Sequence, residues 1–330
     1  MEFSTVTKVD GQRPIVVVTG GIHPAGIERL QQSCTVRLWE EHGVIPRATL
    51  LSWLNDADAL VSSAGVLVDA PLLAAAPQLR VIAQSSVGYD NVDVSACKRA
   101  GVPFANTPGV LVDATADLTY ALILMVMRRL VEAVDHVRLG MWNDGITMPY
   151  GHDLGQKTLG IVGMGDIGTA VARRARASNM KIVYHNRRRR LDDETLDATH
   201  LPLAGLLAQS DCVVVLTPLS PATEGLFGSS QFANMKPGSF FVNASRGLVV
   251  DTAALVTSLE SGHLAGAALD VTDPEPLPAD HALLKMKNVV VTPHIGSATH
   301  ETRTAMALLT ADNIIRGLAR QPLLSEVTVS

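Results

Sequence analysis

Short runs of apolar, often β-branched residues alternate along the chain with amphipathic stretches. Residues 14–19, 58–62 and 79–84 are three such runs, and each has the apolar character of a buried strand. The stretch 46–54 between the first two has the residue spacing of a helix. Strands that alternate with helices predict βαβ units and a parallel sheet in the first part of the chain.

A helical pattern without Gly or Pro covers residues 111–137, and a second series of strands begins behind it. The predicted strands of this second series are 158–162, 181–184, 212–216, 240–243, 266–269 and 289–291. The last segment, 301–318, is again an amphipathic helix. The hydrophobic pattern alone therefore predicts two α/β units.

The composition agrees with a globular α/β protein. The 330 residues are 47% hydrophobic and 18% charged, which provides enough chain and apolar material for two domains with sizeable cores. Aromatic residues make up only 4% of the chain, so the cores must be aliphatic. The formal net charge of −5 gives no global reason to expect nucleic acid or an anionic membrane as a partner.

The cysteines and the N-terminus limit the cellular setting. Cys34, Cys97 and Cys212 have no metal-binding spacing, and their odd number argues against a disulfide framework. We expect all three to be reduced and structural, and we expect no metal site. Residues 1–13 lack the apolar core of a signal peptide, and no stretch approaches the roughly 18–20 apolar residues of a spanning helix. These features predict a soluble, cytoplasmic protein.

A glycine-rich turn lies between a predicted strand and a predicted helix. The pattern Gly163-x-Gly165-x-x-Gly168 follows the strand 158–162 directly and precedes a helix over 169–177. In a dinucleotide site, the first glycine permits the tight turn, the second lets the backbone approach the pyrophosphate, and the third lets the helix pack on the strand. The N–H groups at the helix N-terminus favour phosphate binding. The alternative is a purely structural turn, because short glycine motifs also arise by chance.

The end of the next strand indicates which cofactor is used. NAD enzymes usually carry Asp or Glu about 20 residues past the glycine turn, to bind the ribose 2′-hydroxyl. This chain has Asn186 there, followed directly by four arginines, 187–190. A 2′-phosphate requires charged planar donors, so we expect NADP(H) to be preferred over NAD(H), with Arg187 and Arg188 on the phosphate and the other two solvated. The alternative is that all four arginines form a solvated loop.

Three further polar motifs follow predicted strands of the second unit. Arg246 lies in the loop 243–247, Glu275 in a Pro-Glu-Pro sequence, and His294 in a Thr-Pro-His-Ile-Gly-Ser sequence. All three come at the carboxyl ends of parallel strands, where doubly wound sheets bind their ligands. A glycine turn followed in order by these Arg, Glu and His motifs resembles the D-2-hydroxyacid dehydrogenase family, across nearly the whole chain.

The resemblance implies reduction of a 2-keto acid by a nicotinamide cofactor. His294 is then the expected acid and base, because imidazole titrates near pH ~6.5. Glu275 is expected to hydrogen-bond the other ring nitrogen and to favour the imidazolium form. Arg246 is expected to bind the substrate carboxylate and to polarise the carbonyl through its planar fork. The resemblance also implies that the backbone N–H groups of Val87 and Gly88 bind the substrate carboxylate.

Other cofactor contacts are implied by position in the family pattern. Besides the glycine turn and Asn186, they are Thr115, Ile167, Thr217, Pro218, Thr223, Asp270 and Gly296. Asp270 is expected to bond the carboxamide, with a strand-end cap as the alternative. Asp166 in the turn departs from the Arg that the family often has there, and a carboxylate cannot pair with phosphate. We therefore expect Asp166 to point outward.

The resemblance also implies how the two units are connected. The expected fold class is α/β, with two doubly wound parallel-sheet domains. Residues 1–108 and 298–330 are expected to form a discontinuous, flavodoxin-like substrate-binding domain. Residues 109–297 are expected to form a Rossmann dinucleotide-binding domain that is inserted in it, and the helix at 301–318 then returns to the first domain.

Residues 111–118 and the Arg138-x-Gly-x-Trp142 sequence resemble the NADP-preferring branch of the family, which reduces glyoxylate, hydroxypyruvate or 2-ketogluconate. The resemblance implies a homodimer, in which Trp142 either reaches the substrate site of the neighbouring subunit or packs in the interface. Two alternatives stay open from the sequence. One is a dehydrogenase of another 2-hydroxy acid or of an oxyanion such as phosphite, and the other is a nucleotide-sensing protein similar to a corepressor.

Overall fold

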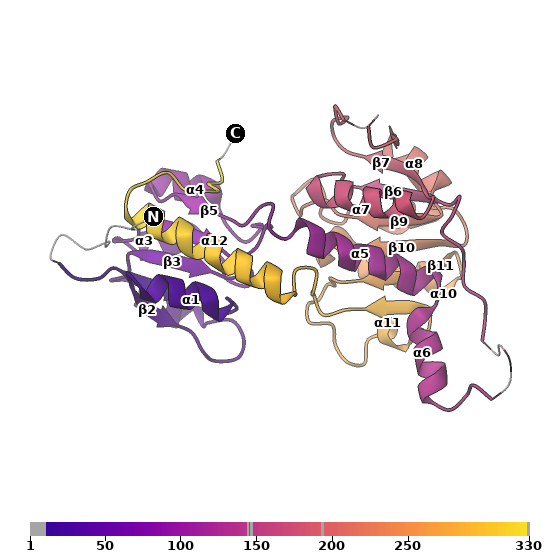
Figure 1. Cartoon of the computed structure of the whole chain (residues 1–330), viewed down its shortest axis with the longest axis horizontal. Helices are drawn as coiled ribbons and strands as arrows, with labels where there is room; N and C mark the ends of the chain where they lie inside the picture. The colour runs from indigo at the N-terminus through magenta and orange to yellow at the C-terminus, as the bar shows by residue number, and fades with distance from the viewer. Residues whose placement is uncertain (1–10, 144, 146–147, 193–194, 329–330) are drawn as a thin grey trace. The chain divides into compact units, whose positions relative to one another are not determined.

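The computed structural model describes residues 11–143, 145, 148–192 and 195–328. Residues 1–10 and 329–330, which the expected domain bounds include, lie outside the described residues. The chain divides into two compact units, which Figure 1 colours by residue number. The first unit consists of Met1–Leu111 together with Ser297–Ser330, and the second unit is Val112–Gly296.

The first unit is an open parallel sheet with helices on both faces. Its elements are β1 (Ile15–Val18), α1 (Pro24–Gln31), β2 (Thr35–Leu38), α2 (Arg47–Leu54), β3 (Ala59–Ser62), α3 (Ala70–Ala74), β4 (Val81–Gln84), α4 (Val94–Ala100), β5 (Phe104–Ala105) and α12 (His300–Leu318). The strand order is β2-β1-β3-β4-β5, and all pairs are parallel. This is the flavodoxin-like order of a doubly wound sheet.

Alternate side chains of these strands enter two separate cores. Val17 and Leu60 pack with α2, α3 and α4 on one face, whereas Val16 and Val61 pack with α1 and α12 on the other. The helix α12, from the C-terminal part of the chain, lies beside α1 (Figure 1). Because successive strand residues point to opposite faces and both faces are covered, these strands are continuously apolar.

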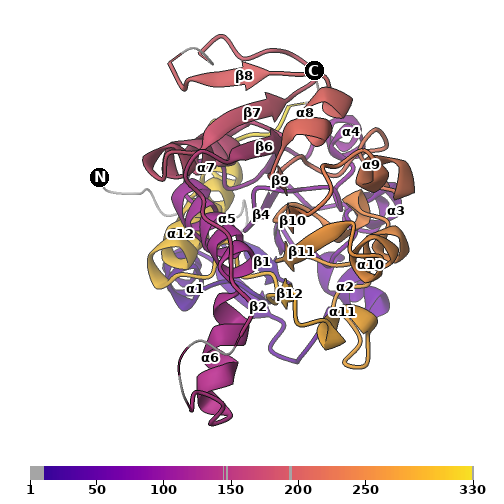
Figure 2. The same ribbon diagram turned by 90° about the vertical axis from the view of Figure 1, so that its right-hand side faces the viewer.

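The second unit is a larger parallel sheet. Its elements are α5 (Val112–Met127), α6 (Leu130–Arg138), β6 (Thr158–Val162), α7 (Asp166–Ala177), β7 (Lys181–His185), β8 (Ala198–His200), α8 (Leu203–Gln209), β9 (Cys212–Val215), α9 (Ser229–Ala233), β10 (Ser239–Asn243), the 3₁₀ turn η1 (Gly247–Val249), α10 (Thr252–Glu260), β11 (Leu264–Leu269), α11 (Ala282–Lys285) and β12 (Val289–Val291). Figure 2 shows the strand order β12-β11-β10-β9-β6-β7-β8. The order reverses between β6 and β9, which is where such sheets bind nucleotides.

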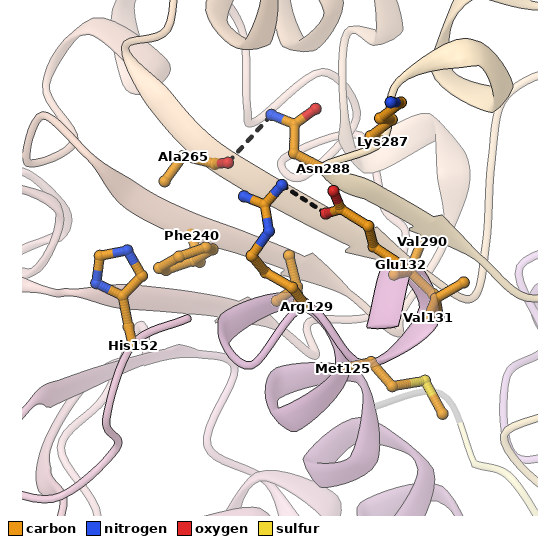
Figure 3. A pocket seen from close by; sticks show the side chains of 11 residues that line it. Met125, Arg129, Val131, Glu132, His152, Phe240, Ala265, Lys287, Asn288 and Val290 are labelled. Carbon is orange, nitrogen blue, oxygen red and sulfur yellow. Dashed lines mark hydrogen bonds and ion pairs between the residues drawn. The ribbon is translucent and has the colours of Figure 1, made fainter. Parts of the chain in front are cut away.

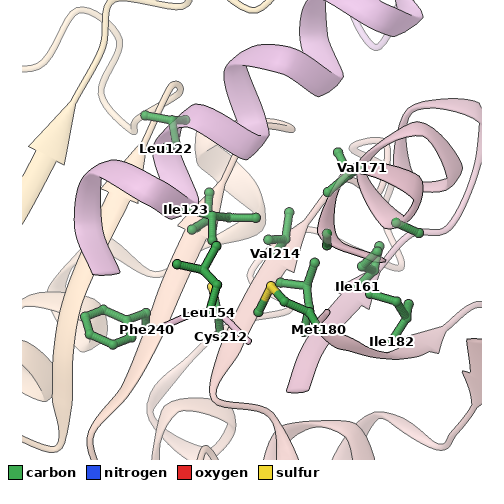
Figure 4. Packing of buried hydrophobic residues seen from close by; sticks show 14 of the residues in the cluster. Leu122, Ile123, Leu154, Ile161, Val171, Met180, Ile182, Cys212, Val214 and Phe240 are labelled. Atoms are coloured by element: carbon green, nitrogen blue, oxygen red, sulfur yellow. The ribbon is translucent and has the colours of Figure 1, made fainter. Parts of the chain in front are cut away.

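The second sheet is also covered on both faces. The helices α5 and α7 pack on one face over side chains such as Ile161 and Val214 (Figure 4). The helices α8, α9, α10 and α11 cover the other face. Cys212 lies in the first of these cores, and like Cys34 and Cys97 it is a buried free thiol.

The single helix that the pattern predicts over 111–137 is wrong, because the structure has two helices there. The break falls at Arg129, which adopts a left-handed backbone with φ of 54°. The N–H of His152 donates to the carbonyl of Met127 at 2.8 Å and takes an acceptor that a continuing helix would use. Arg129 then pairs with Glu132 at 2.5 Å (Figure 3). The interrupting segment of chain is not local, so periodicity does not reveal the break.

Most other expected elements are found with ends that differ by a few residues. The strands at Thr158–Val162 and Val289–Val291 have the expected bounds. The helix expected from residue 169 already begins at Asp166, because the end of the glycine turn is its first turn. The two doubly wound parallel sheets confirm the predicted fold class. Within the described residues, no helix has the length and apolar character needed to cross a bilayer.

Candidate active site

The three candidate catalytic residues follow neighbouring strands of the second sheet. Arg246 comes after β10, Glu275 after β11 and His294 after β12. These strands are adjacent and parallel, so their carboxyl ends meet at the same edge of the sheet. The topology therefore brings all three loops to one place within a single unit.

His294 and Glu275 form a hydrogen-bonded pair. The Nδ1 atom of His294 lies 2.7 Å from Oε1 of Glu275, and both side chains are 43% exposed. The hydrogen bond from His294 is the largest cause that holds the pKa of Glu275 below its usual value, although partial burial acts in the opposite direction. A carboxylate only accepts hydrogen bonds, so Nδ1 carries the proton and the pair leaves Nε2 for another partner.

The buried carboxylate of Asp270 anchors the loop that carries His294. Its Oδ1 accepts from the hydroxyl of Thr292 at 2.7 Å and from the N–H of Ile295 at 2.9 Å, and its Oδ2 accepts from the N–H of Gly296 at 2.9 Å. The backbone carbonyl of Asp270 also accepts from the N–H of His294 at 2.9 Å. His294 has a left-handed backbone, with φ of 53°, which these contacts hold in place. Asp270 is thus a cap for this loop.

The loop after β10 lies directly against the loop after β11. A Cβ atom at Gly247 would lie only 1.9 Å from the carbonyl oxygen of Thr272, so no side chain fits there. The half-buried Arg246 precedes this contact. After the hydrogen bond from His294, its charge is a further cause of the lowered pKa of Glu275. The close packing therefore keeps a cation near the His294–Glu275 pair.

The three glycines of the nucleotide turn have different surroundings. A Cβ at Gly163, where φ is 98°, would lie 2.5 Å from the backbone nitrogen of Thr217. A Cβ at Gly168 would lie 2.7 Å from the carbonyl oxygen of Gly163. At Gly165 the Cβ position has no described atom within 4 Å. The turn is closed against the protein at its first and third glycines and open at its second, as a bound pyrophosphate requires.

Several other candidate cofactor contacts cluster in this unit. Thr115 is buried, and a Cβ at Gly296 would lie 3.3 Å from both its Cγ2 and Oδ2 of Asp270. Asp166 is exposed in the first turn of α7, whereas Ile167 packs against the core under that helix. The structure thus brings Thr115, Asp270 and Gly296 together.

The loop after β9 contains three more candidates. The hydroxyl of Thr223 accepts from the N–H of Ser220 at 2.8 Å and donates to the carbonyl of Pro218 at 2.7 Å. Thr217, at the start of the loop, lies against Gly163. Thr217, Pro218 and Thr223 therefore belong to one closed loop beside the glycine turn.

Asn186 is bound to the glycine turn. Its Oδ1 accepts from the N–H of Met164 at 2.7 Å, and its Nδ2 donates to the carbonyl of Met164 at 3.1 Å. Arg187 and Arg188 follow it and are exposed. Among the described residues, neither guanidinium has a carboxylate partner. The prediction that Arg190 is merely solvated is wrong, because it pairs twice with a carboxylate and also donates to the Met164 carbonyl at 3.1 Å.

Val87 and Gly88 lie in the first unit, in the loop after β4. The carbonyl of Val87 accepts from Nδ2 of Asn106 at 2.8 Å, and the carbonyl of Gly88 accepts from Gln84 at 2.9 Å and from Ser86 at 2.6 Å. Within the described residues, the N–H groups of Val87 and Gly88 donate to no acceptor. The loop is held through its carbonyls and keeps its N–H groups available.

Comparison with known proteins identifies the family. Residues 120–296 match the NAD binding domain of the D-isomer specific 2-hydroxyacid dehydrogenases. The chain belongs to this dehydrogenase family. It is 44% identical over 309 residues to the glyoxylate reductase of Thermococcus litoralis, a match that covers 92% of this chain and 93% of that protein.

Solved structures support the same assignment for the dehydrogenase. A protein from Thermus thermophilus matches 95% of this chain and 100% of that chain, with a TM-score of 0.89 and 41% identity. The NADPH-dependent glyoxylate/hydroxypyruvate reductase of Sinorhizobium meliloti, in complex with NADP and malonate, matches 96% and 97%, with a TM-score of 0.86 and 34% identity. The protein is an NAD(P)-dependent oxidoreductase of this family.

Two features of the dehydrogenase lie apart from these loops. Trp142 follows α6 and is 70% exposed. A pocket lined by Arg129, Glu132, Phe240 and Asn288 lies at the amino ends of β10, β11 and β12, the opposite edge from the candidate catalytic loops (Figure 3). The Arg129–Glu132 ion pair occupies this pocket, so we assign the pocket to the packing between α5 and α6.

Sequence motifs point to the candidate catalytic side chains but miss several residues that hold other parts of the candidate site. No motif contains Tyr184 and His200, which lie near Asn186, or Gln84 and Asn106, which bind the carbonyls of the loop at Val87 and Gly88. Each acts through a hydrogen bond to a residue that is distant in the chain or to a backbone group. No local pattern signals such a bond.

Proposed function

We propose that this dehydrogenase reduces a small 2-keto acid, with glyoxylate as the first candidate, and that it prefers NADPH. The main support for this proposal is the hydrogen bond of 2.7 Å between His294 Nδ1 and Glu275 Oε1. It lies at the same edge of the sheet as the loop that carries Arg246. A proton donor beside a guanidinium suits a substrate that has both a carbonyl and a carboxylate. The identity to the glyoxylate reductase of Thermococcus litoralis supports glyoxylate. Hydroxypyruvate and 2-ketogluconate are further candidates, and a chiral product would have the D configuration.

The described residues fit a nicotinamide dinucleotide. The space at Gly165 and the N-terminus of α7 suit the pyrophosphate. The residues that would hold the rest of the cofactor are Thr115, Thr217, Pro218, Thr223, Asp270 and Gly296. When bound, the reduced cofactor supplies the hydride that adds to the keto carbon.

The side chains of the protein would manage the proton and the negative charge. His294 would donate a proton from Nε2 to the carbonyl oxygen, because Glu275 holds Nδ1. The Glu275 carboxylate would stabilise the imidazolium before the transfer. Arg246 would bind the substrate carboxylate and polarise the carbonyl. In the oxidation direction, neutral His294 would take the proton of the hydroxyl.

The loop at Val87 and Gly88 would provide further donors for the substrate carboxylate. Its two carbonyls are already bonded within the protein, and its two N–H groups donate to no acceptor among the described residues. Backbone N–H groups that are fixed in this way favour an anion. With this proposed role, the first unit would be the substrate-binding domain that is predicted from the sequence.

The preference for NADPH rests on the exposed Arg187 and Arg188. They follow Asn186 at the end of β7, where NAD enzymes place a carboxylate. Neither guanidinium has a carboxylate partner among the described residues, so binding of a phosphate would break none of the ion pairs that the structure describes. The Sinorhizobium meliloti relative is NADPH-dependent and its structure contains NADP, which agrees with this proposal.

We further propose that the functional protein is a homodimer that forms through α6. Leu130, Val134 and Val137 lie along one face of this helix and are exposed, and so are Leu139, Met141 and Trp142, which follow the helix in the chain. An apolar surface of this kind on a helix favours burial against a partner. A second copy would cover it, with Trp142 in the interface or at the neighbouring substrate site.

The test measures initial rates of NADPH and NADH oxidation with glyoxylate, hydroxypyruvate and 2-ketogluconate offered separately. Fast turnover with a 2-keto acid and a higher kcat/KM for NADPH would support the proposal. The double variant R187A/R188A should then lose NADPH affinity far more than NADH affinity. Equal losses for the two cofactors would exclude the phosphate role of these arginines.

Absence of turnover has two distinguishable outcomes. Reduction of NADP+ or NAD+ with phosphite would show that the substrate is an oxyanion and not a 2-keto acid. Tight nucleotide binding without any turnover would favour a nucleotide-sensing protein. R129A, which changes the opposite edge of the sheet, is a control for general damage to the unit.

A further inference from the structure

We propose that His200 is a positioning residue for NADPH selectivity, because it fixes the backbone from which Arg187 and Arg188 extend. This inference rests on the NADPH preference proposed above. It concerns a residue on the edge strand β8, outside the glycine turn and the arginine sequence. The residues concerned are the arginine arch, which we define as residues 186–190.

The first end of the arginine arch is held at Asn186 by two elements. The side-chain amide of Asn186 is bonded to the N–H and the carbonyl of Met164, in the glycine turn. Its backbone carbonyl lies 3.1 Å from Nε2 of His200. A carbonyl only accepts hydrogen bonds, so Nε2 of His200 is the donor. Asn186 therefore has its side chain fixed by the glycine turn and its peptide group fixed by β8.

The second end of the arginine arch is held at Arg190. Its backbone N–H donates to the hydroxyl of the buried Tyr184 at 2.9 Å. Its guanidinium bonds Asp192 at 2.7 and 2.9 Å and donates to the Met164 carbonyl at 3.1 Å. Arg190 is thus bonded within the protein, and it would have to break these bonds in order to bind a ligand.

Arg187 and Arg188 are exposed between these two fixed ends. A phosphate clamp gains affinity when its donors need little ordering on binding. The bond from His200 fixes the peptide group that immediately precedes Arg187, so its loss would let the first end of the arch move. The 2′-phosphate would then be bound less well, whereas contacts at the glycine turn would be affected little.

His200 is itself held in place by its neighbours. Its ring lies 5.1 Å from that of Tyr184 and is nearly parallel to that of His185, at 6.3 Å. Nδ1 of His185 is 2.9 Å from the carbonyl of Leu201, which ties β7 to the end of β8 a second time. The donor of His200 is therefore presented to the arch by a rigid edge of the sheet.

The test compares three variants of the full-length protein. H200L removes the donor and keeps an apolar side chain beside Tyr184, and H200Q keeps an amide donor at a similar reach. H263L is the matched control, because Nε2 of His263 makes an equivalent bond at 3.0 Å to the carbonyl of Met235, away from the arch. Dissociation constants are measured by calorimetry for NADPH and NADH, and for the fragments adenosine 2′,5′-bisphosphate and 5′-AMP.

We expect H200L to raise the Kd of NADPH and of adenosine 2′,5′-bisphosphate by about 3- to 10-fold, the scale of one hydrogen bond. The Kd values of NADH and 5′-AMP should change less than about twofold, and H200Q should restore most of the difference. H263L should leave the ratio of the two cofactor constants unchanged. A fold defect would instead lower the Tm and weaken all four ligands together.

Two results would overturn this inference, and they are distinct from failure of the proposed function. If R187A/R188A abolishes the NADPH preference but H200L leaves it intact, His200 has no positioning role. If H200Q is as impaired as H200L, the hydrogen bond is not what matters. A wild-type protein without any preference for NADPH would instead remove the proposal on which this inference depends.

Discussion

At the scale of single residues, the proposed mechanism depends on one charge-assisted hydrogen bond. Glu275 accepts from His294, and this bond is the main cause of its lowered pKa. The variant E275Q keeps an acceptor oxygen and removes the charge. We expect kcat for keto acid reduction to fall roughly 10- to 100-fold, the scale of a hydrogen bond to a charged group. The Kd of NADPH should stay unchanged, which calorimetry would check.

The controls for E275Q are a neighbouring carboxylate and the histidine itself. D280N alters an exposed charge in the same loop region and should retain full activity. H294A should reduce kcat by about 10²–10⁴-fold, which is the usual range for loss of an acid–base group. If E275Q turned over at the wild-type rate, the ion pair would have no part in the mechanism.

The lowered pKa also predicts how stability depends on pH. A carboxyl group whose pKa is lower in the folded state stabilises the protein fully above its ordinary pKa, near ~4.3, and loses this effect as the pH falls through the lowered value. The difference in Tm between wild type and E275Q should therefore be present at pH ~7 and shrink below about pH 4. The difference will be small, because both side chains are 43% exposed to solvent.

At the scale of elements, the glycine turn between β6 and α7 contains one glycine that the fold requires and another that we expect to serve only cofactor binding. A Cβ at Gly163 meets backbone at 2.5 Å in a left-handed conformation, whereas a Cβ at Gly165 meets no described atom within 4 Å. We expect G163A to lower the free energy of unfolding by about 1–3 kcal/mol or more. G165A should keep the wild-type Tm and weaken NADPH and NADH alike, on the order of tenfold or about 1.4 kcal/mol.

Thermal melts and calorimetry of the two glycine variants distinguish these effects. Each variant serves as the control for the other, because both add one methyl group to the same turn. A G165A protein that binds both cofactors as tightly as wild type would show that the backbone at this position does not approach the pyrophosphate.

The elements that the sequence predicts are those whose signal is local. The strand Thr158–Val162 is continuously apolar, and the turn behind it is marked by its glycines, so both follow from a short window. The break at Arg129 does not follow, because the N–H that takes the Met127 carbonyl belongs to His152. Helical periodicity reports which face is apolar, and it carries no information about a competing donor elsewhere in the chain.

The same distinction holds for the candidate site. Arg246, Glu275 and His294 are found from motifs, because each lies in a loop directly after a strand. The hydrogen bonds that hold Asn186, and the commitment of Arg190 to the protein, depend on the folded arrangement of β7, β8 and the glycine turn. The sequence of four arginines does not show which of them form hydrogen bonds within the protein and which extend into solvent.

At the scale of the whole molecule, α6 presents an apolar surface that the described part of the chain leaves exposed. In Figures 1 and 2 this helix extends beyond the sheet of the second unit. Val134 and Val137 are 45% and 53% exposed, so charged substitutions there should not disturb the folded subunit. These two positions therefore test association separately from folding.

We expect V134D/V137D to convert a dimer into a monomer. Burial of each valine in an interface contributes about 1.5–3 kcal/mol, so the dimer Kd should rise about 100-fold or more, before the cost of burying a charge. Light scattering coupled to size exclusion would measure the mass over a range of concentrations. L67D is the control, because Leu67 is an exposed apolar residue of the first unit, and this variant should remain dimeric.

The activity of the monomeric variant then decides the role of Trp142. If the tryptophan reaches the neighbouring substrate site, V134D/V137D and W142A should both raise KM for the keto acid and leave the Kd of NADPH unchanged. If it only packs in the interface, W142A should weaken the dimer while each remaining dimer keeps the wild-type KM. A wild-type protein that is monomeric at all concentrations would contradict the proposed assembly, and the apolar surface of α6 would then need another partner.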